Sequence, residues 1–66
     1  MLYIETDKYQ ASHVHKPRGW GLWLFELHYA DGRTERRDCT GTYATAARTV
    51  RGFADFREAC RVYVLP

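Results

Sequence analysis

The sequence predicts a single α+β domain spanning residues 1–66: a small antiparallel sheet with the order β-β-β-α-β and one helix packed on one face. Three observations support this prediction. Apolar and polar residues alternate through Leu22–Ala30, an Asp31-Gly32 pair follows, and a helical stripe of apolar residues starts at Tyr43. Because side chains alternate between strand faces but recur every three or four residues on a helix, the two periods distinguish the two kinds of element.

The N-terminal part predicts a strand, a segment of open interpretation and a loop. Alternation predicts the first strand at Leu2–Thr6. For Ser12–Lys16 two interpretations remain, a continuation of that strand after a bulge or a separate short strand. Both place His13 and His15 on one side of a strand. Pro17–Gly21 is expected to be a loop, because Pro lacks an N–H and Gly permits unusual backbone angles.

The two central strands, at 22–30 and 33–40, are predicted to form a hairpin. Asp-Gly is a strong signal for a two-residue type I′ turn between such runs. That turn would set two pairs of complementary charge opposite each other, Glu26 with Arg37 and His28 with Glu35. Each such pair stabilises a sheet by roughly 0.2–1 kcal/mol. The second strand is polar on both faces, which is typical of an edge strand.

A helix is predicted over 43–54, followed by a last strand at Cys60–Leu65. The apolar stripe of the helix consists of Tyr43, Ala46, Ala47, Val50, Phe53 and Ala54. Thr42 is the expected N-cap, because its hydroxyl can accept a hydrogen bond from an otherwise unpaired amide. The stripe is expected to cover the strand face that carries Trp23, Phe25, Leu27 and Tyr29.

Length, charge and composition limit the function. A chain of 66 residues buries a small fraction of its surface, which leaves little stability for an enclosed active-site cavity. No catalytic motif or phosphate loop is present, so we expect neither an enzyme nor a cofactor. The net charge of +2 is too small to establish nucleic-acid binding. Without a signal peptide or a long apolar run, a cytoplasmic location and no membrane partner are expected.

Histidine and cysteine provide a weak candidate for metal binding. His13, His15, His28, Cys39 and Cys60 together contain the nitrogen and sulfur ligands that zinc prefers. Two isolated cysteines lack the paired spacing of zinc modules, so no metal ligand is predicted. The alternatives are exposed histidines with two small buried thiols, or a Cys39–Cys60 disulfide, which a cytoplasmic location disfavours. A thiol paired with His28 lacks a third group to orient it, so no catalytic residue is predicted.

Part of the sequence resembles a family of DNA-binding domains. The alternating Trp-x-Phe-x-Leu-x-Tyr strand, the Asp-Gly turn, the arginine-bearing strand and the Thr-Tyr-x-Thr-Ala-Ala helix start resemble the three-stranded DNA-binding domains at integrase N-termini, over about half of the chain. Those domains lay a sheet in the major groove, which implies DNA contacts by Arg33, Arg36 and Arg37. This chain departs from them by its C-terminal strand and by Glu35 and Asp38 among the arginines. DNA or RNA binding is therefore the alternative hypothesis.

Protein binding is the first hypothesis. In size and architecture the chain resembles small accessory proteins of phages and plasmids, including anti-CRISPR and anti-restriction inhibitors. The resemblance implies inhibition or modulation of a host protein or nucleoprotein complex. If Leu22 and Leu24 are uncovered, they mark an interaction site or a dimer interface, so the chain is expected to be a monomer or a homodimer. Trp, Tyr and Arg dominate binding hot spots, and the predicted contact residues are Arg18, Trp20, Leu22, Leu24, Arg48 and Arg51. The alternatives are that Trp20 covers the core and that the N-terminal segment covers Leu22 and Leu24.

Overall fold

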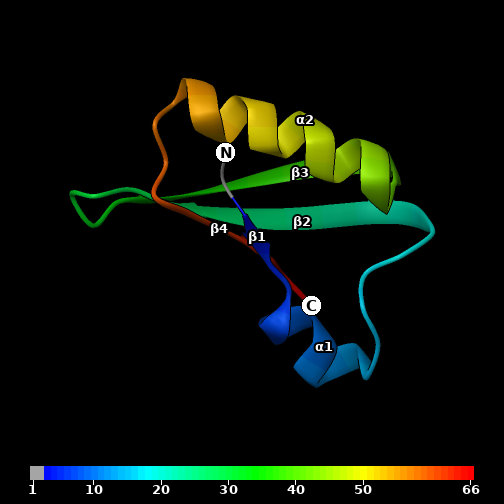
Figure 1. The fold of residues 1–66 in the computed structure, drawn as a ribbon. Coiled ribbons are helices and arrows are strands. Elements are labelled where there is room, and N and C mark those ends of the chain that lie inside the picture. Colours follow the sequence, from blue (N-terminus) through cyan, green and yellow to red (C-terminus); the bar gives the residue numbers. More distant parts are fainter. Residues whose placement is uncertain (1–2) are drawn as a thin grey trace.

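The computed structural model describes residues 3–66 and confirms the α+β class. The elements are β1 (Ile4–Glu5), α1 (Asp7–His13), β2 (Trp20–His28), β3 (Thr34–Thr42), α2 (Tyr43–Phe56) and β4 (Arg61–Val64). The four strands form one sheet in the order β1-β4-β2-β3. α2 lies on one side of this sheet and α1 lies on the other (Figure 1). No helix in this part of the chain is long and apolar enough to cross a membrane.

The four strands occur in the predicted order, but the sheet is mixed rather than purely antiparallel. β2 runs antiparallel to both β3 and β4, whereas β1 runs parallel to β4 with Ile4 opposite Val62. The prediction was wrong on this point because β4 inserts between β1 and β2. β1 and β4 both run opposite to β2, and they are therefore parallel to each other. Leu2, the first residue of the predicted strand, lies outside the described residues.

α1 replaces the strand that was expected to carry both His13 and His15. His13 is in the last turn of this seven-residue helix, and Val14 ends it with a left-handed φ of 63°. Tyr9 is the one buried residue of α1, and it packs into the core. A single buried side chain in two turns leaves no apolar period in the sequence, which is why the pattern did not indicate a helix.

The β2–β3 hairpin turns through three residues, Ala30–Gly32, instead of the predicted two. Tyr29 N–H donates to the Arg33 carbonyl at 2.9 Å, and Gly32 N–H donates to the Tyr29 carbonyl at 3.0 Å. Gly32 has a φ of 91°. A turn followed by a left-handed glycine is the usual form of a three-residue hairpin loop. Asp31-Gly32 thus marks the turn correctly but occupies only its last two positions.

The three-residue loop shifts the register by one residue and changes the charge pairs. Glu26 lies opposite Arg36 rather than Arg37, and His28 lies opposite Thr34 rather than Glu35. Directly opposite residues share a face of the sheet. Arg36 therefore joins Glu26 on the face directed away from α2, while Arg37 is on the α2 face.

The core lies between α2 and the sheet, as predicted. From α2 it takes Ala46, Ala47, Val50 and Ala54, and from the strands Ile4, Trp23, Phe25, Leu27, Val62 and Val64. Thr42 is the N-cap, because Thr45 N–H donates to its Oγ1 at 3.2 Å. The helix continues without a break through Gly52 to Phe56. β3 is the sheet edge, in agreement with its polar sequence.

Candidate functional site

Three large apolar side chains are exposed along β2, on the face directed away from α2. Trp20 is 74% exposed, Leu22 is 61% exposed and Leu24 is 40% exposed. They occupy alternate positions of one strand and therefore share a face. We call these three residues the β2 patch. The two alternative interpretations are wrong: Trp20 does not cover the core, and Leu22 and Leu24 are not covered by the N-terminal segment.

A pocket of about 270 Å³ adjoins the β2 patch and involves three parts of the chain. The lining includes the patch and Arg18, Tyr9 and His13 of α1, and Leu65 and Pro66 after the end of β4. Arg18 supplies a fixed positive charge, and none of the described residues that line the pocket is Asp or Glu. Four predicted contact residues, Arg18 and the three patch residues, therefore meet at one site.

Stacked aromatic rings support the α1 side of this pocket. Tyr9 stacks on His13 with ring centroids 4.1 Å apart, and its ring lies 5.7 Å from that of Trp23. The indole N–H of Trp23 donates to the Gly41 carbonyl at 3.0 Å. The pocket wall thus continues into the core. The sequence did not indicate Tyr9 as a site residue, because its proximity to β2 depends on the path of α1.

The remaining two predicted contact residues lie elsewhere. Arg48 and Arg51 are on α2, where they line a separate depression together with Tyr3 and Tyr43. α2 is on the other side of the sheet from α1 (Figure 1). The structure therefore does not bring these two arginines to the β2 patch.

The hairpin arginines do not form one surface. Arg36 and Arg37 occupy adjacent positions of β3 and face opposite sides of the sheet. Each arginine also contacts a group of the chain itself: Arg33 Nε lies 2.7 Å from Asp31 Oδ2, Arg36 Nε lies 3.6 Å from Glu26 Oε2, and the Arg37 guanidinium lies 4.0 Å from the Phe53 ring centroid. A docked nucleic acid would have to compete with these contacts.

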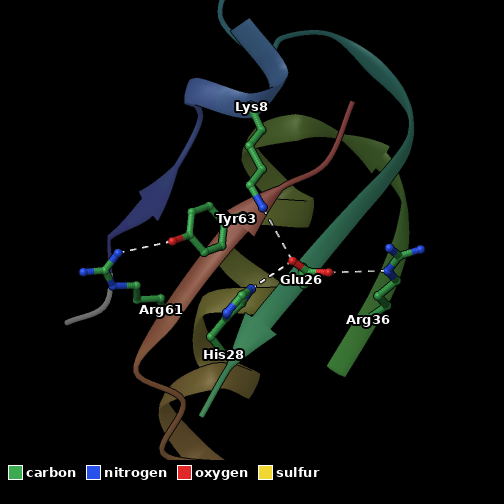
Figure 2. A network of polar contacts seen from close by, with 6 residues as sticks. All are labelled: Lys8, Glu26, His28, Arg36, Arg61 and Tyr63. Carbon is green, nitrogen blue, oxygen red and sulfur yellow. Dashed lines mark hydrogen bonds and ion pairs between the residues drawn. The ribbon is translucent and has the colours of Figure 1, made fainter. Parts of the chain in front are cut away.

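A polar cluster around Glu26 occupies the rest of the face directed away from α2 (Figure 2). His28 Nε2 lies 2.9 Å from Glu26 Oε1, and Lys8 Nζ lies 3.7 Å from the same oxygen. Arg36 Nε approaches the other carboxylate oxygen. The hydrogen bond from His28 is the largest cause of the lowered pKa of Glu26; burial opposes it, and the charges of Lys8, His28 and Arg36 assist it.

This cluster connects α1 to the sheet. Lys8 comes from α1, and its ammonium lies 4.4 Å from the ring centroid of Tyr63 on β4. Arg61 in turn donates to the Tyr63 hydroxyl at 3.2 Å. Lys8 and His28 contact one carboxylate oxygen of Glu26, and Arg36 contacts the other. These contacts indicate a structural role, in which the cluster holds α1 against the sheet. The sequence pattern placed Glu26 and His28 on one face but gave no signal for Lys8 or Tyr63.

The cysteines and histidines do not converge. Cys39 is half-buried, Cys60 is exposed, and both are free thiols. The expected burial of both thiols is therefore wrong for Cys60, and the alternative disulfide does not form. The rings of His13 and His15 lie 6.0 Å apart. Within residues 3–66, no three groups from His, Cys, Asp and Glu are arranged to hold a metal ion.

Comparisons with protein-family models, with curated proteins and with solved structures found no match. The fold and its surface define a small α+β domain with one apolar patch beside a positively charged group. Its function is therefore inferred from the geometry of that patch.

Proposed function

We propose that this chain is a non-catalytic protein-binding module whose contact surface is the β2 patch together with Arg18. The observation that carries the proposal is the exposure of Trp20, Leu22 and Leu24 side by side on one strand. Contiguous exposed apolar side chains mark interaction sites, whereas scattered ones do not. A tryptophan and an arginine at the rim are the residue types that dominate binding energy. In this proposal, as in the resemblance to phage and plasmid accessory proteins, the partner is a host protein or nucleoprotein complex.

The geometry favours protein binding over the alternative of DNA or RNA binding. Phosphate contacts supply most of the affinity for a nucleic acid. Arg33, Arg36 and Arg37 contact Asp31, Glu26 and Phe53 and are divided between the turn and two faces. The β2 patch, by contrast, presents three apolar side chains in one direction.

The proposal is tested by affinity capture from a bacterial lysate, with and without nuclease. The variant is Trp20→Ala, and the matched control is Phe56→Ala, because Phe56 is an aromatic residue exposed by 83% at the end of α2. We expect the wild type and Phe56→Ala to capture the same defined protein after nuclease treatment, and Trp20→Ala to retain about a tenth of it or less. Capture that nuclease abolishes would support the nucleic-acid alternative. Equal capture by all three forms would remove the β2 patch from the site.

A further inference from the structure

β3 has a strand on one side only. It is the outermost strand of the sheet, and it pairs with β2 over its full length, Thr34–Thr42, without an interruption of the register. In the chain, β3 lies between β2 and α2, whereas the ends of the sequence adjoin β1 and β4 on the other side of β2. The open position beside β3 is therefore not the direct continuation of either end of the sequence.

The hydrogen bonds to β2 show which backbone groups of β3 point outward. The Arg33 carbonyl accepts from Tyr29 N–H at 2.9 Å, and Tyr43 N–H donates to the Gly19 carbonyl at 2.8 Å. Arg33 and Tyr43 thus direct these groups to β2, and successive residues of a strand alternate between its two sides. The even-numbered residues of β3 therefore direct their N–H and carbonyl groups to the free edge, where they are a template for another strand.

The usual protections of a long sheet edge are missing at β3. The core side chains under α2 come largely from β2 and β4, whereas every residue of β3 is exposed or half-buried. Proteins also protect such edges with Pro, Lys or a bulge. β3 contains neither Pro nor Lys, and its register with β2 is continuous. Its remaining protection is its charged side chains, and their order determines which strand they admit.

The charges of β3 form a symmetrical sequence. Glu35, Arg36, Arg37 and Asp38 are negative, positive, positive and negative in that order. When two β3 strands pair antiparallel about a twofold axis perpendicular to the sheet, directly opposite residues lie on the same face. Two registers then place opposite charges across the ladder, Arg36 with Asp38 or Glu35 with Arg37 of the second copy. Each register forms its charge pair twice, which stabilises the ladder.

Contacts within the chain favour the register that sets Arg36 opposite Asp38. Asp38 has no ion pair among the described residues, so its carboxylate is open to a second copy. Glu35, in contrast, already accepts from the Tyr29 hydroxyl at 2.7 Å. Arg36 and Asp38 are both even-numbered, so the same two residues also exchange backbone hydrogen bonds in this register.

The favoured register brings the two copies of Arg37 together at the twofold axis. Like charges directly opposite each other destabilise a ladder. Each Arg37 guanidinium, however, lies 4.0 Å from the ring centroid of Phe53 in its own α2. This cation–π contact holds the charge over its own helix rather than at the axis. The cost of the central pair is therefore reduced by a contact that the single chain already makes.

We propose that two copies of this chain associate through β3, antiparallel, with Arg36 of each copy opposite Asp38 of the other. The two sheets join into one, and both α2 helices lie on the same face. This dimer is independent of the proposed protein-binding function, because it uses β3 and not the β2 patch. Where both hold, the two patches face the same side of the joined sheet, and a partner with two matching sites gains avidity.

Sedimentation equilibrium from about 1 μM to about 1 mM chain tests the association. We expect wild type to dimerise and Asp38→Arg to raise the dissociation constant at least about tenfold, because it sets like charges opposite each other twice. Asp7→Arg makes the same change of charge at an exposed position of α1 and should match wild type within about twofold. A wild type that remains monomeric at about 1 mM overturns the proposal. So does a dimer that Trp20→Ala dissociates and Asp38→Arg does not, because it forms through the β2 patch.

Disulfide formation tests the register. In a Cys39→Ala, Cys60→Ala background, Arg37→Cys places two thiols at the twofold axis, where the Cα atoms of a non-hydrogen-bonded pair are about 4.5 Å apart, within disulfide range. Thr34→Cys in the same background is the matched control, because its two copies would lie about 20 Å apart. We expect oxidation to give a covalent dimer of the Arg37→Cys form only. Equal yields from the two forms would overturn the register.

Amide hydrogen exchange tests the backbone pairing without a substitution. In dilute wild-type chain we expect the outward amides of Arg36 and Asp38 to exchange fast, and the amide of Arg37, which is directed to β2, to exchange slowly. At a concentration where the chain is dimeric, exchange at Arg36 and Asp38 should slow by about tenfold or more, since each amide gains a hydrogen bond. Unchanged exchange at both residues in the dimer would overturn the pairing through β3.

Discussion

Glu26 is the residue on which the face directed away from α2 depends. Its side chain is 16% exposed and contacts Lys8, His28 and Arg36. These partners lower its pKa below the ordinary value of 4.5, chiefly through the His28 hydrogen bond. A carboxyl whose pKa is lower in the folded chain than in the unfolded chain stabilises the fold above the unfolded pKa. That contribution disappears as the pH falls through the lowered, folded pKa.

We expect Glu26→Gln to reduce the free energy of unfolding by about 1–2 kcal/mol at pH 7, because Lys8, Arg36 and His28 lose the carboxylate that they share. The difference from wild type should shrink as the pH falls from about 5 through the lowered pKa, where the wild-type carboxyl also becomes neutral. Urea unfolding at a series of pH values measures both effects. Glu58→Gln, at an exposed position, is the matched control. A difference that stays constant down to the lowest pH would contradict this account of Glu26.

At the scale of elements, the hairpin depends on the backbone angle of Gly32. Its φ of 91° disfavours any residue with a Cβ, so Gly32→Ala should destabilise the chain by about 1–2 kcal/mol. Gly52→Ala is a control for which the opposite change in stability is expected. Gly52 lies within α2, and a methyl group added at its Cα would meet open space, so Gly52→Ala should stabilise by about 1 kcal/mol. Thermal unfolding of both variants tests the three-residue turn, and a neutral Gly32→Ala would argue against it.

The N-terminus of α2 should be sensitive to its cap. Thr42 Oγ1 accepts from Thr45 N–H, and Thr42→Ala should cost about 1 kcal/mol by leaving that amide unpaired. Thr42→Ser should restore most of the loss, because it keeps the hydroxyl. Thr49→Ala, at an exposed position of the same helix, should be close to neutral. Chemical denaturation measures all three, and equal losses for Thr42→Ala and Thr42→Ser would show that the hydroxyl is not the cause.

The elements that sequence predicted are those with a regular apolar period. β2 alternates, and α2 carries a stripe whose Ala46, Ala47, Val50 and Ala54 are buried. α1 was missed because Tyr9 is its only buried residue. The sequence did not indicate the parallel pairing of β1, because a strand of two residues is too short for its pattern to show which strand it pairs with. Its partner is β4, whose place between β1 and β2 is decided by long-range packing.

The site was predictable only where it is local in sequence. Arg18 and the three residues of the β2 patch lie within seven consecutive residues, and all four residues line the pocket. Tyr9, His13 and Leu65 reach the pocket from α1 and from the end of β4, so long-range packing decides their place.

At the scale of the molecule, the two faces of the sheet carry different side chains. The face under α2 carries the fully buried Phe25, Leu27, Val62 and Val64. The other face carries the exposed β2 patch and the Glu26 cluster, and Lys8 of α1 contacts Glu26. Exposed apolar side chains that lie side by side, unlike scattered ones, mark an interaction site. We infer that stability and binding depend largely on different residues.

The two tryptophans test that separation. Trp23 is 6% exposed and packs against Tyr9 and Tyr43, so Trp23→Ala should cost about 3–5 kcal/mol. A domain of this length has a total stability of only about 3–10 kcal/mol, and we expect this variant to be partly or wholly unfolded at 25 °C. Trp20→Ala should change the free energy of unfolding by less than about 0.5 kcal/mol. Urea unfolding followed by circular dichroism measures both, and acrylamide should quench the fluorescence of Trp20 more strongly than that of Trp23. A loss above about 1.5 kcal/mol for Trp20→Ala would mean that the β2 patch supports the fold, and its exposure would no longer indicate a binding surface.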